Sequence, residues 1–162
     1  MEIRQSNATT IEVEESEFAN KRTDVNTSVR SLFSRKRFDT GEVIAKFSSR
    51  KTYPTPNYLT VQINEHEHVE LMPEYLECIN HSCDPNCFFD TTSWQLIALK
   101  AIEKGEELTF FYPSAEWEMD QAFQCHCGSL ACIGMIQGAK YLSKGSVRKY
   151  RFTDFIMQKL NT

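Results

Sequence analysis

The most informative stretch of this sequence is Asn80-His81-Ser82-Cys83-Asp84-Pro85-Asn86. Its side chains are almost all polar, yet apolar residues flank it on both sides. Such a stretch is either a turn between strands or an active-site loop, because binding and catalytic residues concentrate on loops that a rigid scaffold positions. On its own, the Asn-His-Ser sequence also fits a capping turn. Other parts of the chain therefore have to decide between these interpretations.

A cysteine cluster follows further along the chain, where three of the six cysteines occupy the eight residues from Cys125 to Cys132. Thiolate is the preferred ligand of structural zinc, and three thiolates on one short loop can surround a single ion. The neighbouring residues are polar and turn-forming, which disfavours three buried free thiols. Redox dithiols usually have two intervening residues, unlike Cys125 and Cys127. The spacing predicts one zinc ion on Cys125, Cys127 and Cys132, with a fourth ligand from His126 or from elsewhere.

Short strands dominate the predicted secondary structure. Apolar residues alternate with polar ones, or form short runs, in these stretches: 11–14, 29–33, 43–47, 58–63, 68–72, 87–89, 95–101 and 108–111. Such patterns predict strands that are half-buried or buried. From Lys144 onward, apolar residues recur near helical spacing, with Ser146 as the expected N-cap. We therefore expect a mainly β fold with a C-terminal amphipathic helix packed on the strands.

The composition is ordinary for one soluble globular domain, with 162 residues, 41% hydrophobic and 25% charged. The chain has no run of about 18 apolar residues, and Met1–Thr10 is polar, so we expect neither a membrane span nor a secretory signal. These features predict an intracellular protein, cytoplasmic or nuclear. The net charge of −4 favours a Lys-rich partner and gives no reason to expect direct nucleic-acid binding.

A third segment connects these features. It reads Gly105-Glu106-Glu107-Leu108-Thr109-Phe110-Phe111-Tyr112. Alone, it fits a strand that ends in a tyrosine with a solvent-exposed hydroxyl. In this order and spacing, however, the three segments resemble the SET-domain family of protein-lysine methyltransferases. The resemblance runs from about Thr27 to Gln137. It includes the complete asparagine-histidine motif, the strand ending in tyrosine, and the post-SET cysteine pattern.

This resemblance implies a fold of several small sheets with a pseudoknot, a rare exception to unthreaded connections. The implied organisation has an N-terminal strand or extension at 1–26, a SET domain at 27–115 and a post-SET zinc loop at 116–138. A C-terminal helix at 139–162 packs on the same domain.

The resemblance also implies the site residues. Cys83 becomes the fourth zinc ligand, with Cys87 as its competitor, and Tyr112 lies beside the transferring methyl group. Phe110 occupies the position where phenylalanine leaves room for a methylated amine. The cofactor, S-adenosylmethionine, is expected to contact Ser28, Val29, Arg30, Tyr58, Asn80, His81, Tyr112 and Met135.

The implied reaction is methyl transfer from a sulfonium to the neutral side-chain amine of lysine in a protein, histone-like or otherwise basic. Lysine has a pKa of about 10.4, which an apolar channel lowers by desolvating the ammonium. The expected walls of this channel are Phe47, Phe110, Phe111 and Tyr112. Four thiolates leave no open zinc position, so the metal is expected to be structural.

The chain departs from the family pattern at Phe47, where several branches have tyrosine, and at the expected cofactor loop. The cofactor loop usually reads glycine-x-glycine, but Val29 and Ser31 occupy those positions here. Valine does not tolerate a positive φ. Two alternatives therefore stay open: a non-catalytic binding module on the SET scaffold, and an enzyme of this scaffold that acts on a small molecule.

Overall fold

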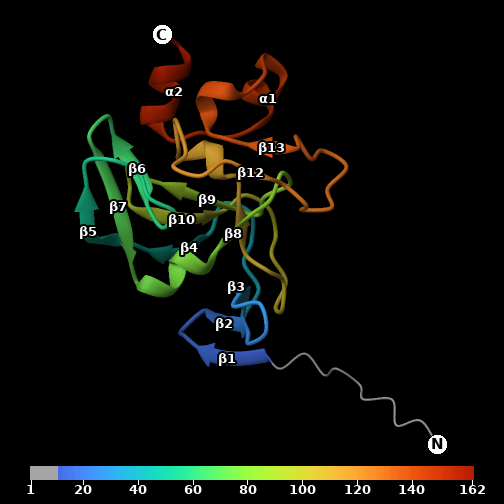
Figure 1. The fold of residues 1–162 in the computed structure, drawn as a ribbon. Helices are drawn as coiled ribbons and strands as arrows, with labels where there is room; N and C mark the ends of the chain where they lie inside the picture. Colours follow the sequence, from blue (N-terminus) through green and yellow to red (C-terminus); the bar gives the residue numbers. More distant parts are fainter. Residues whose placement is uncertain (1–10) are drawn as a thin grey trace, which may run out of the picture.

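A computed structural model of the protein describes residues 11–162, so the first ten residues of the predicted extension 1–26 lie outside it. The described chain forms small β-sheets with short helices after them, which confirms the mainly β expectation (Figure 1). None of its helices combines the length and the apolar character that a membrane span requires.

The first sheet is antiparallel and lies at the opposite end of the molecule from the C-terminal helices (Figure 1). It contains β1 (Ile11–Glu15), β2 (Ala19–Asp24) and β3 (Arg30–Ser34). Strand β3 is joined to a later segment, because the backbone N–H of Leu108 donates to the carbonyl of Leu32 at 2.8 Å. The expected cofactor strand therefore runs beside the segment that leads to Tyr112.

A five-stranded sheet carries the Asn80-His81 segment. Its strands, in spatial order, are β4 (Val43–Lys46), β10 (Gln95–Ala98), β9 (Cys87–Asp90), β11 (Thr109–Phe110) and β8 (Asn80–His81). Strand β11 inserts between β9 and β8 and pairs in parallel with both. This insertion places the end of β11 beside His81. Strand pairing alone does not define a threaded chain, so the pseudoknot stays a prediction.

The third sheet covers one side of the core, in the order β5 (Ser48–Tyr53), β7 (Glu67–Met72) and β6 (Val61–Asn64). A 3-10 helix, η1 (Glu74–Cys78), follows β7 and buries Leu76. Apolar side chains from this sheet, from η1 and from the five-stranded sheet form one core cluster. This cluster forms the support under the candidate site.

The C-terminal part is held by backbone pairing and by helix caps. Its elements are η2 (Tyr112–Ser114), β12 (Phe123–Gln124), β13 (Met135–Ile136), η3 (Ala139–Tyr141), α1 (Lys144–Lys149) and α2 (Asp154–Leu160). The sequence predicted one helix with its N-cap at Ser146, but two helices form, capped by Ser143 and Thr153. Extended backbone between them lets the Tyr150 ring stack on Phe111, with centroids 3.7 Å apart. The Tyr150 hydroxyl also donates to the Cys83 carbonyl at 2.7 Å, so this residue is held at the break between the two helices.

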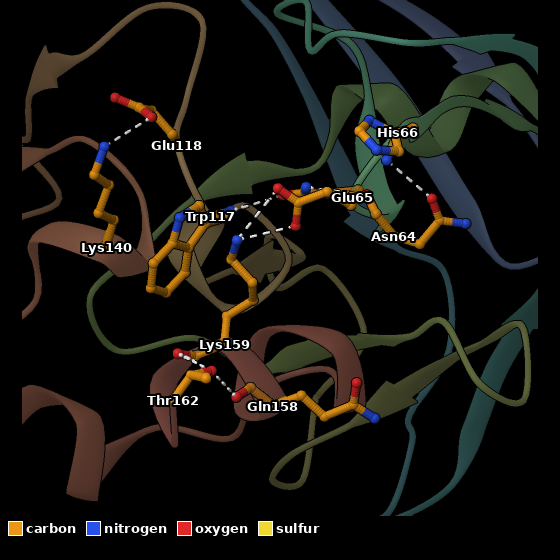
Figure 2. A network of polar contacts seen from close by, with 10 residues as sticks. Asn64, Glu65, His66, Trp117, Glu118, Lys140, Gln158, Lys159 and Thr162 are labelled. Carbon is orange, nitrogen blue, oxygen red and sulfur yellow. Dashed lines mark hydrogen bonds and ion pairs between the residues drawn. The ribbon is translucent and has the colours of Figure 1, made fainter.

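Helix α2 is anchored to the turn between β6 and β7, as Figure 2 shows. The Nζ atom of Lys159 lies 2.9 Å from Glu65 Oε2 and 5.0 Å from the centroid of the Trp117 ring. An exposed ion pair of this kind adds little stability. The contacts show that the last helix lies beside Trp117, in the segment that follows Tyr112.

Candidate active site and metal centre

Four cysteines from two distant parts of the chain form one cluster. The Sγ atoms of Cys83, Cys125, Cys127 and Cys132 all lie within 4.8 Å of one another. A Zn–S distance of about 2.3 Å places tetrahedral sulfurs about 3.8 Å apart, and the Cys83 and Cys125 sulfurs are separated by 3.9 Å. The four donors therefore fit a tetrahedral metal site. The competing candidate, Cys87, lies outside this group and donates to Asn86 Oδ1 instead.

Backbone geometry prepares the cysteine loop for negative sulfur atoms. The N–H of Ile133 points at Cys83 Sγ at 3.5 Å, and the N–H of Cys127 points at Cys125 Sγ at 3.4 Å. Gly134 adopts a φ of +81°, and its carbonyl accepts a hydrogen bond from the Cys125 N–H at 2.8 Å. A side chain at Gly134 would be strained at this φ, which gives that glycine its role.

The cysteine thiols differ in acidity. Burial raises the pKa of the Cys83 thiol to about 12. Burial also acts on Cys127, but hydrogen bonds outweigh it and lower the pKa of that thiol to about 7. A bound cation would deprotonate coordinating thiols, because its charge stabilises the thiolate form.

His81 connects the cysteine cluster to Tyr112. Its Nδ1 atom accepts a hydrogen bond from the Tyr112 backbone N–H at 3.1 Å, and its Nε2 atom lies 3.3 Å from Cys83 Sγ. Burial lowers the pKa of His81 to about 4. The neutral ring therefore carries its hydrogen on Nε2 and donates it to the sulfur.

Tyr112 begins η2, separated from the end of β11 by Phe111, and its ring and hydroxyl are both in contact with neighbouring groups. The hydroxyl donates to the Ile79 carbonyl at 3.2 Å, and the ring lies 4.6 Å from the Phe110 ring, measured between centroids. Burial raises the pKa of this phenol to about 12. At neutral pH the hydroxyl is thus a hydrogen-bond donor and not a base.

Two cavities meet at Tyr112. The first, which we call the Tyr58 cavity, has a volume of about 220 Å³. It is mostly apolar and includes Tyr58, Leu59, Val61, Leu76, Ile79, Phe110, Tyr112, Glu116, Met119, Asp120 and Phe123 in its lining. The second, the His81 cavity, has a volume of about 360 Å³ and is lined by Asn80, His81, Tyr112, Phe123, Cys125, His126 and Cys127. Tyr112 and Phe123 line both.

The structure brings only some of the expected cofactor residues together. Asn80, His81 and Tyr112 share the His81 cavity, and the Asn80 side-chain amide donates to the Arg30 carbonyl at 2.8 Å. Tyr58 is not in the lining of the His81 cavity. It lines the other, mostly apolar cavity and is 75% exposed.

The other expected cofactor residues lie apart from the His81 cavity. Ser28 and Val29 are exposed in the turn before β3, and Met135 lines a different cavity, together with Gly138 and Ser143. The N–H groups of this turn are partly held by the Asp24 carboxylate, which accepts from Asn26 at 2.8 Å.

The expected channel walls require a correction. Phe110 and Tyr112 line the Tyr58 cavity, but Phe47 packs on Phe89 and Trp94 in the core, and Phe111 stacks on Tyr150. Phe111 follows the end of β11 as the N-cap of η2, and its ring packs against Tyr150 and Phe152 instead.

Sequence reasoning missed two lining residues with special positions. Phe123 lines both cavities, and its place two residues before Cys125 is the signal that ties it to the cysteine loop. Glu116 lines the Tyr58 cavity although it is buried. No pattern in the sequence distinguishes Glu116 from an exposed acid.

Comparison with known proteins identifies the family of this chain. The sequence pattern of the SET domain matches residues 29–113, more than half of the chain. The chain therefore belongs to the SET-domain family, which confirms the resemblance.

Several curated proteins resemble this chain. Methyltransferase flvH of Aspergillus flavus is 38% identical over 99 residues, which cover 60% of this chain and 55% of that protein. The H3 lysine-36-specific histone-lysine N-methyltransferase of Mycosarcoma maydis is 41% identical over 68 residues, 37% of this chain and 7% of that enzyme. The chain thus spans about half of the first relative and a small part of the second.

Solved structures agree on the fold. A crystal structure of KRYPTONITE in complex with mCHG DNA and SAH has a TM-score of 0.52 and 22% identity, covering 65% of this chain and 26% of that one. A second KRYPTONITE structure, with mCHH DNA, an H3(1–15) peptide and SAH, also has a TM-score of 0.52. It is 20% identical, and the match covers 78% of this chain and 29% of that one. These likenesses confirm the SET fold.

Proposed function

We propose that this chain is an S-adenosylmethionine-dependent protein-lysine N-methyltransferase with one structural zinc ion. The observation that carries the proposal is the position of Tyr112 between two cavities, one beside Asn80 and His81 and one with mostly apolar walls. Methyl transfer requires direct contact between the sulfonium methyl and the amine, and we place that contact beside Tyr112 and Phe123, which line both cavities. The relatives and the SAH-containing SET structures support this choice of cofactor.

The chain's own residues would act by positioning and desolvation. S-adenosylmethionine, bound in the His81 cavity, supplies a methyl group on a sulfonium. The apolar walls of the Tyr58 cavity disfavour a charged ammonium and so lower the pKa of a lysine amine. Tyr112, held by its bond to Ile79, presents its ring and hydroxyl where both cavities meet. Fixing two reactants in this way is worth roughly 7–11 kcal/mol of the barrier.

The four cysteines would hold the zinc ion. With four thiolate ligands there is no open position for water or substrate, so the ion acts on structure. It would tie the loop that follows Phe123 to the segment that follows His81, and thereby close the wall that the two cavities share. None of the cysteines among residues 11–162 forms a disulfide, which suits a reducing compartment and supports our proposal of an intracellular location.

The substrate we propose is a lysine-containing basic protein, such as a histone. Two observations support it. The relatives include enzymes named for H3 lysine-36 and H3 lysine-4. In addition, the net charge of the chain is −4, which favours a positively charged partner.

The non-catalytic alternative depends on Val29, which replaces a glycine. Among the described residues, the positive φ of this turn falls on Ser28, at 59°, and not on Val29. Val29 is 59% exposed, and its side chain is absent from the lining of the His81 cavity. The turn therefore forms without strain at valine, which favours the enzyme over the binding module.

The test is cofactor binding followed by label transfer. Calorimetry of the zinc-loaded protein should detect S-adenosylmethionine, and labelled cofactor should then modify lysine in histone H3 or in another member of a panel of Lys-rich proteins. Absence of both binding and transfer would contradict the proposal. Binding without transfer to any member of the panel would support the binding module instead.

A further inference from the structure

The short stretch between α1 and α2, residues 150–153, is called the C-terminal link below. It lies outside residues 29–113, which match the SET-domain pattern. Its side chains and backbone nevertheless contact residues on either side of Tyr112. The family pattern therefore does not explain what this stretch does.

The C-terminal link contacts η2 at both of its ends. At the start, the Tyr150 ring stacks on Phe111, the N-cap of η2, with centroids 3.7 Å apart and ring planes 8° from parallel. At the end, the backbone N–H of Thr153 donates to the carbonyl of Ser114 at 2.9 Å. Tyr112 is the first residue of η2. The link therefore holds the short turn from which Tyr112 projects.

Tyr150 also contacts a second segment of the site through its hydroxyl, which donates to the Cys83 carbonyl at 2.7 Å. Cys83 lies two residues after His81, and His81 Nδ1 accepts the backbone N–H of Tyr112 at 3.1 Å. The Tyr150 ring thus contacts the segment that carries the donor of this hydrogen bond. Its hydroxyl contacts the segment that carries the acceptor, so one side chain bridges the two.

The contacts around Phe111 are buried and separate from the main core. Phe111 is 2% exposed, and the Phe152 ring packs against it at 6.5 Å between centroids. Protein interiors contain few voids, so removing a ring leaves a gap that its neighbours fill only in part. Phe111 belongs to a different apolar cluster from Phe89 and Leu96, which lie in β9 and β10. Loss of the Tyr150 ring should therefore let the start of η2 shift while those strands stay in place.

We propose that Tyr150 is a positioning residue of the site, which acts through Phe111 and Cys83 to keep Tyr112 hydrogen-bonded to His81. Within residues 11–162, Tyr150 lines neither the Tyr58 cavity nor the His81 cavity, so it acts only through these neighbours. Its effect on methyl transfer rests on the proposed function. Its effect on Tyr112 concerns the protein without cofactor and is measured separately.

The test is amide hydrogen exchange, followed by NMR, on the full-length zinc-loaded protein without cofactor. In Tyr150→Leu, which removes the ring and the hydroxyl, the Tyr112 amide should exchange about tenfold faster or more, because η2 opens locally more often. Amides of β9 and β10 should stay within about twofold of the wild type. Tyr150→Phe keeps the stacked ring and should return exchange at Tyr112 to within about threefold of the wild type.

Tyr141→Leu is the matched control. Tyr141 belongs to the same C-terminal part of the chain, but it is 50% exposed and its hydroxyl donates to Glu118 at 2.6 Å. Because this contact does not involve η2, the variant should leave exchange at Tyr112 within about twofold of the wild type. In a methyl-transfer assay, Tyr150→Leu should lower the rate about tenfold and Tyr150→Phe should restore it to within about threefold, since displaced reacting groups slow transfer.

Faster exchange of all amides in Tyr150→Leu, those of β9 and β10 included, would show that Tyr150 only stabilises the fold. Unchanged exchange at Tyr112, or an equal effect of Tyr141→Leu, would also overturn the inference. If Tyr150→Leu does not fold, the wild type decides. Its Tyr112 and Thr153 amides should open together, with the same dependence on urea, and independent opening contradicts the inference.

The two kinds of measurement separate this inference from the proposed function. Faster exchange at Tyr112 with an unchanged transfer rate defeats only the inference. The expected exchange pattern, without methyl transfer by the wild type to any Lys-rich protein, defeats only the proposed function.

Discussion

The Nε2 atom of His81 lies 3.3 Å from the Sγ atom of Cys83. The opposite nitrogen of the same ring accepts the backbone N–H of Tyr112. One imidazole thus joins the cysteine cluster to the residue that separates the two cavities. This contact explains why a metal that takes no part in the reaction would still affect the reacting site.

Replacing His81 by phenylalanine should weaken zinc binding by about 10–100-fold, because groups that hydrogen-bond metal ligands commonly contribute that much. The phenylalanine ring keeps the packing on Phe111 and Phe123 but loses the N–H that points at sulfur. Competition with a chromophoric chelator measures the affinity. His126→Phe is the control, because His126 is exposed between Cys125 and Cys127, and the zinc affinity of this variant should stay within about twofold of the wild type. Equal affinity of His81→Phe and wild type would show that the contact does not support the metal.

Replacing Cys83 by serine should reduce zinc from about one ion per chain to a small fraction, because one of four ligands is lost. The matched control is Cys87→Ser. That residue is also buried, but it donates to Asn86 Oδ1, a bond that a serine hydroxyl can replace. Elemental analysis of both purified variants decides the point. If zinc persists in Cys83→Ser and disappears in Cys87→Ser, the fourth ligand is Cys87 and the assignment to Cys83 is wrong.

Removing zinc with a chelator should destabilise the C-terminal region while the main core stays folded. Closed zinc sites contribute directly to folding, and the buried sulfurs of Cys83 and Cys125 pack with Ile136. Amide hydrogen exchange should speed up in 123–136 and stay slow in β9 and β10. Uniform exchange rates with and without metal would indicate that the zinc holds no structure together.

Glu116 should make the protein less stable as pH rises. Its pKa is raised in the folded state and ordinary, about 4.3, in the unfolded state. The unfolded chain therefore loses its proton first, and stability declines from about pH 4.3 upward until the folded carboxyl ionises as well. Glu116→Gln lacks this decline, so its stability relative to wild type should grow by up to about 1.4 kcal/mol per pH unit. Urea unfolding of both proteins between about pH 5 and pH 8 measures the difference, and parallel curves would contradict it.

Much of the fold was predictable because apolar periodicity reports burial. Strands such as β7 and β9 follow that pattern. Strand β5 was missed, since nearly all its side chains are exposed and pairing with β7 alone holds it in the sheet. Strands β8 and β11 have two residues each, which is too short for any pattern. Their parallel pairing is a tertiary property, yet it positions Tyr112.

The candidate site divides in a similar way. Cys83 was expected as a partner of the cysteine loop from family resemblance, whereas spacing alone left the fourth ligand open. The lining role of Glu116 and Phe123 depends on how η2 and β12 pack, which local sequence does not encode. Phe47 and Phe111 were expected among the apolar walls of the channel, but Phe47 packs on Phe89 and Trp94 in the core. Phe111 lies between β11 and η2, and its stacking on Tyr150 is a tertiary contact that the local sequence does not reveal.

The most direct test of the central claim is methyl transfer by wild type and Tyr112→Phe, measured by mass spectrometry on the same Lys-rich substrate. If Tyr112 forms the shared wall, wild type should add 14 Da increments (about one CH₂ each, roughly 14 by atomic mass) to lysine. Tyr112→Phe removes only the hydroxyl that donates to Ile79 and should slow transfer by about 100-fold or more, while S-adenosylmethionine still binds. Wild-type rates in Tyr112→Phe, or no transfer by either protein with cofactor bound, would contradict the account.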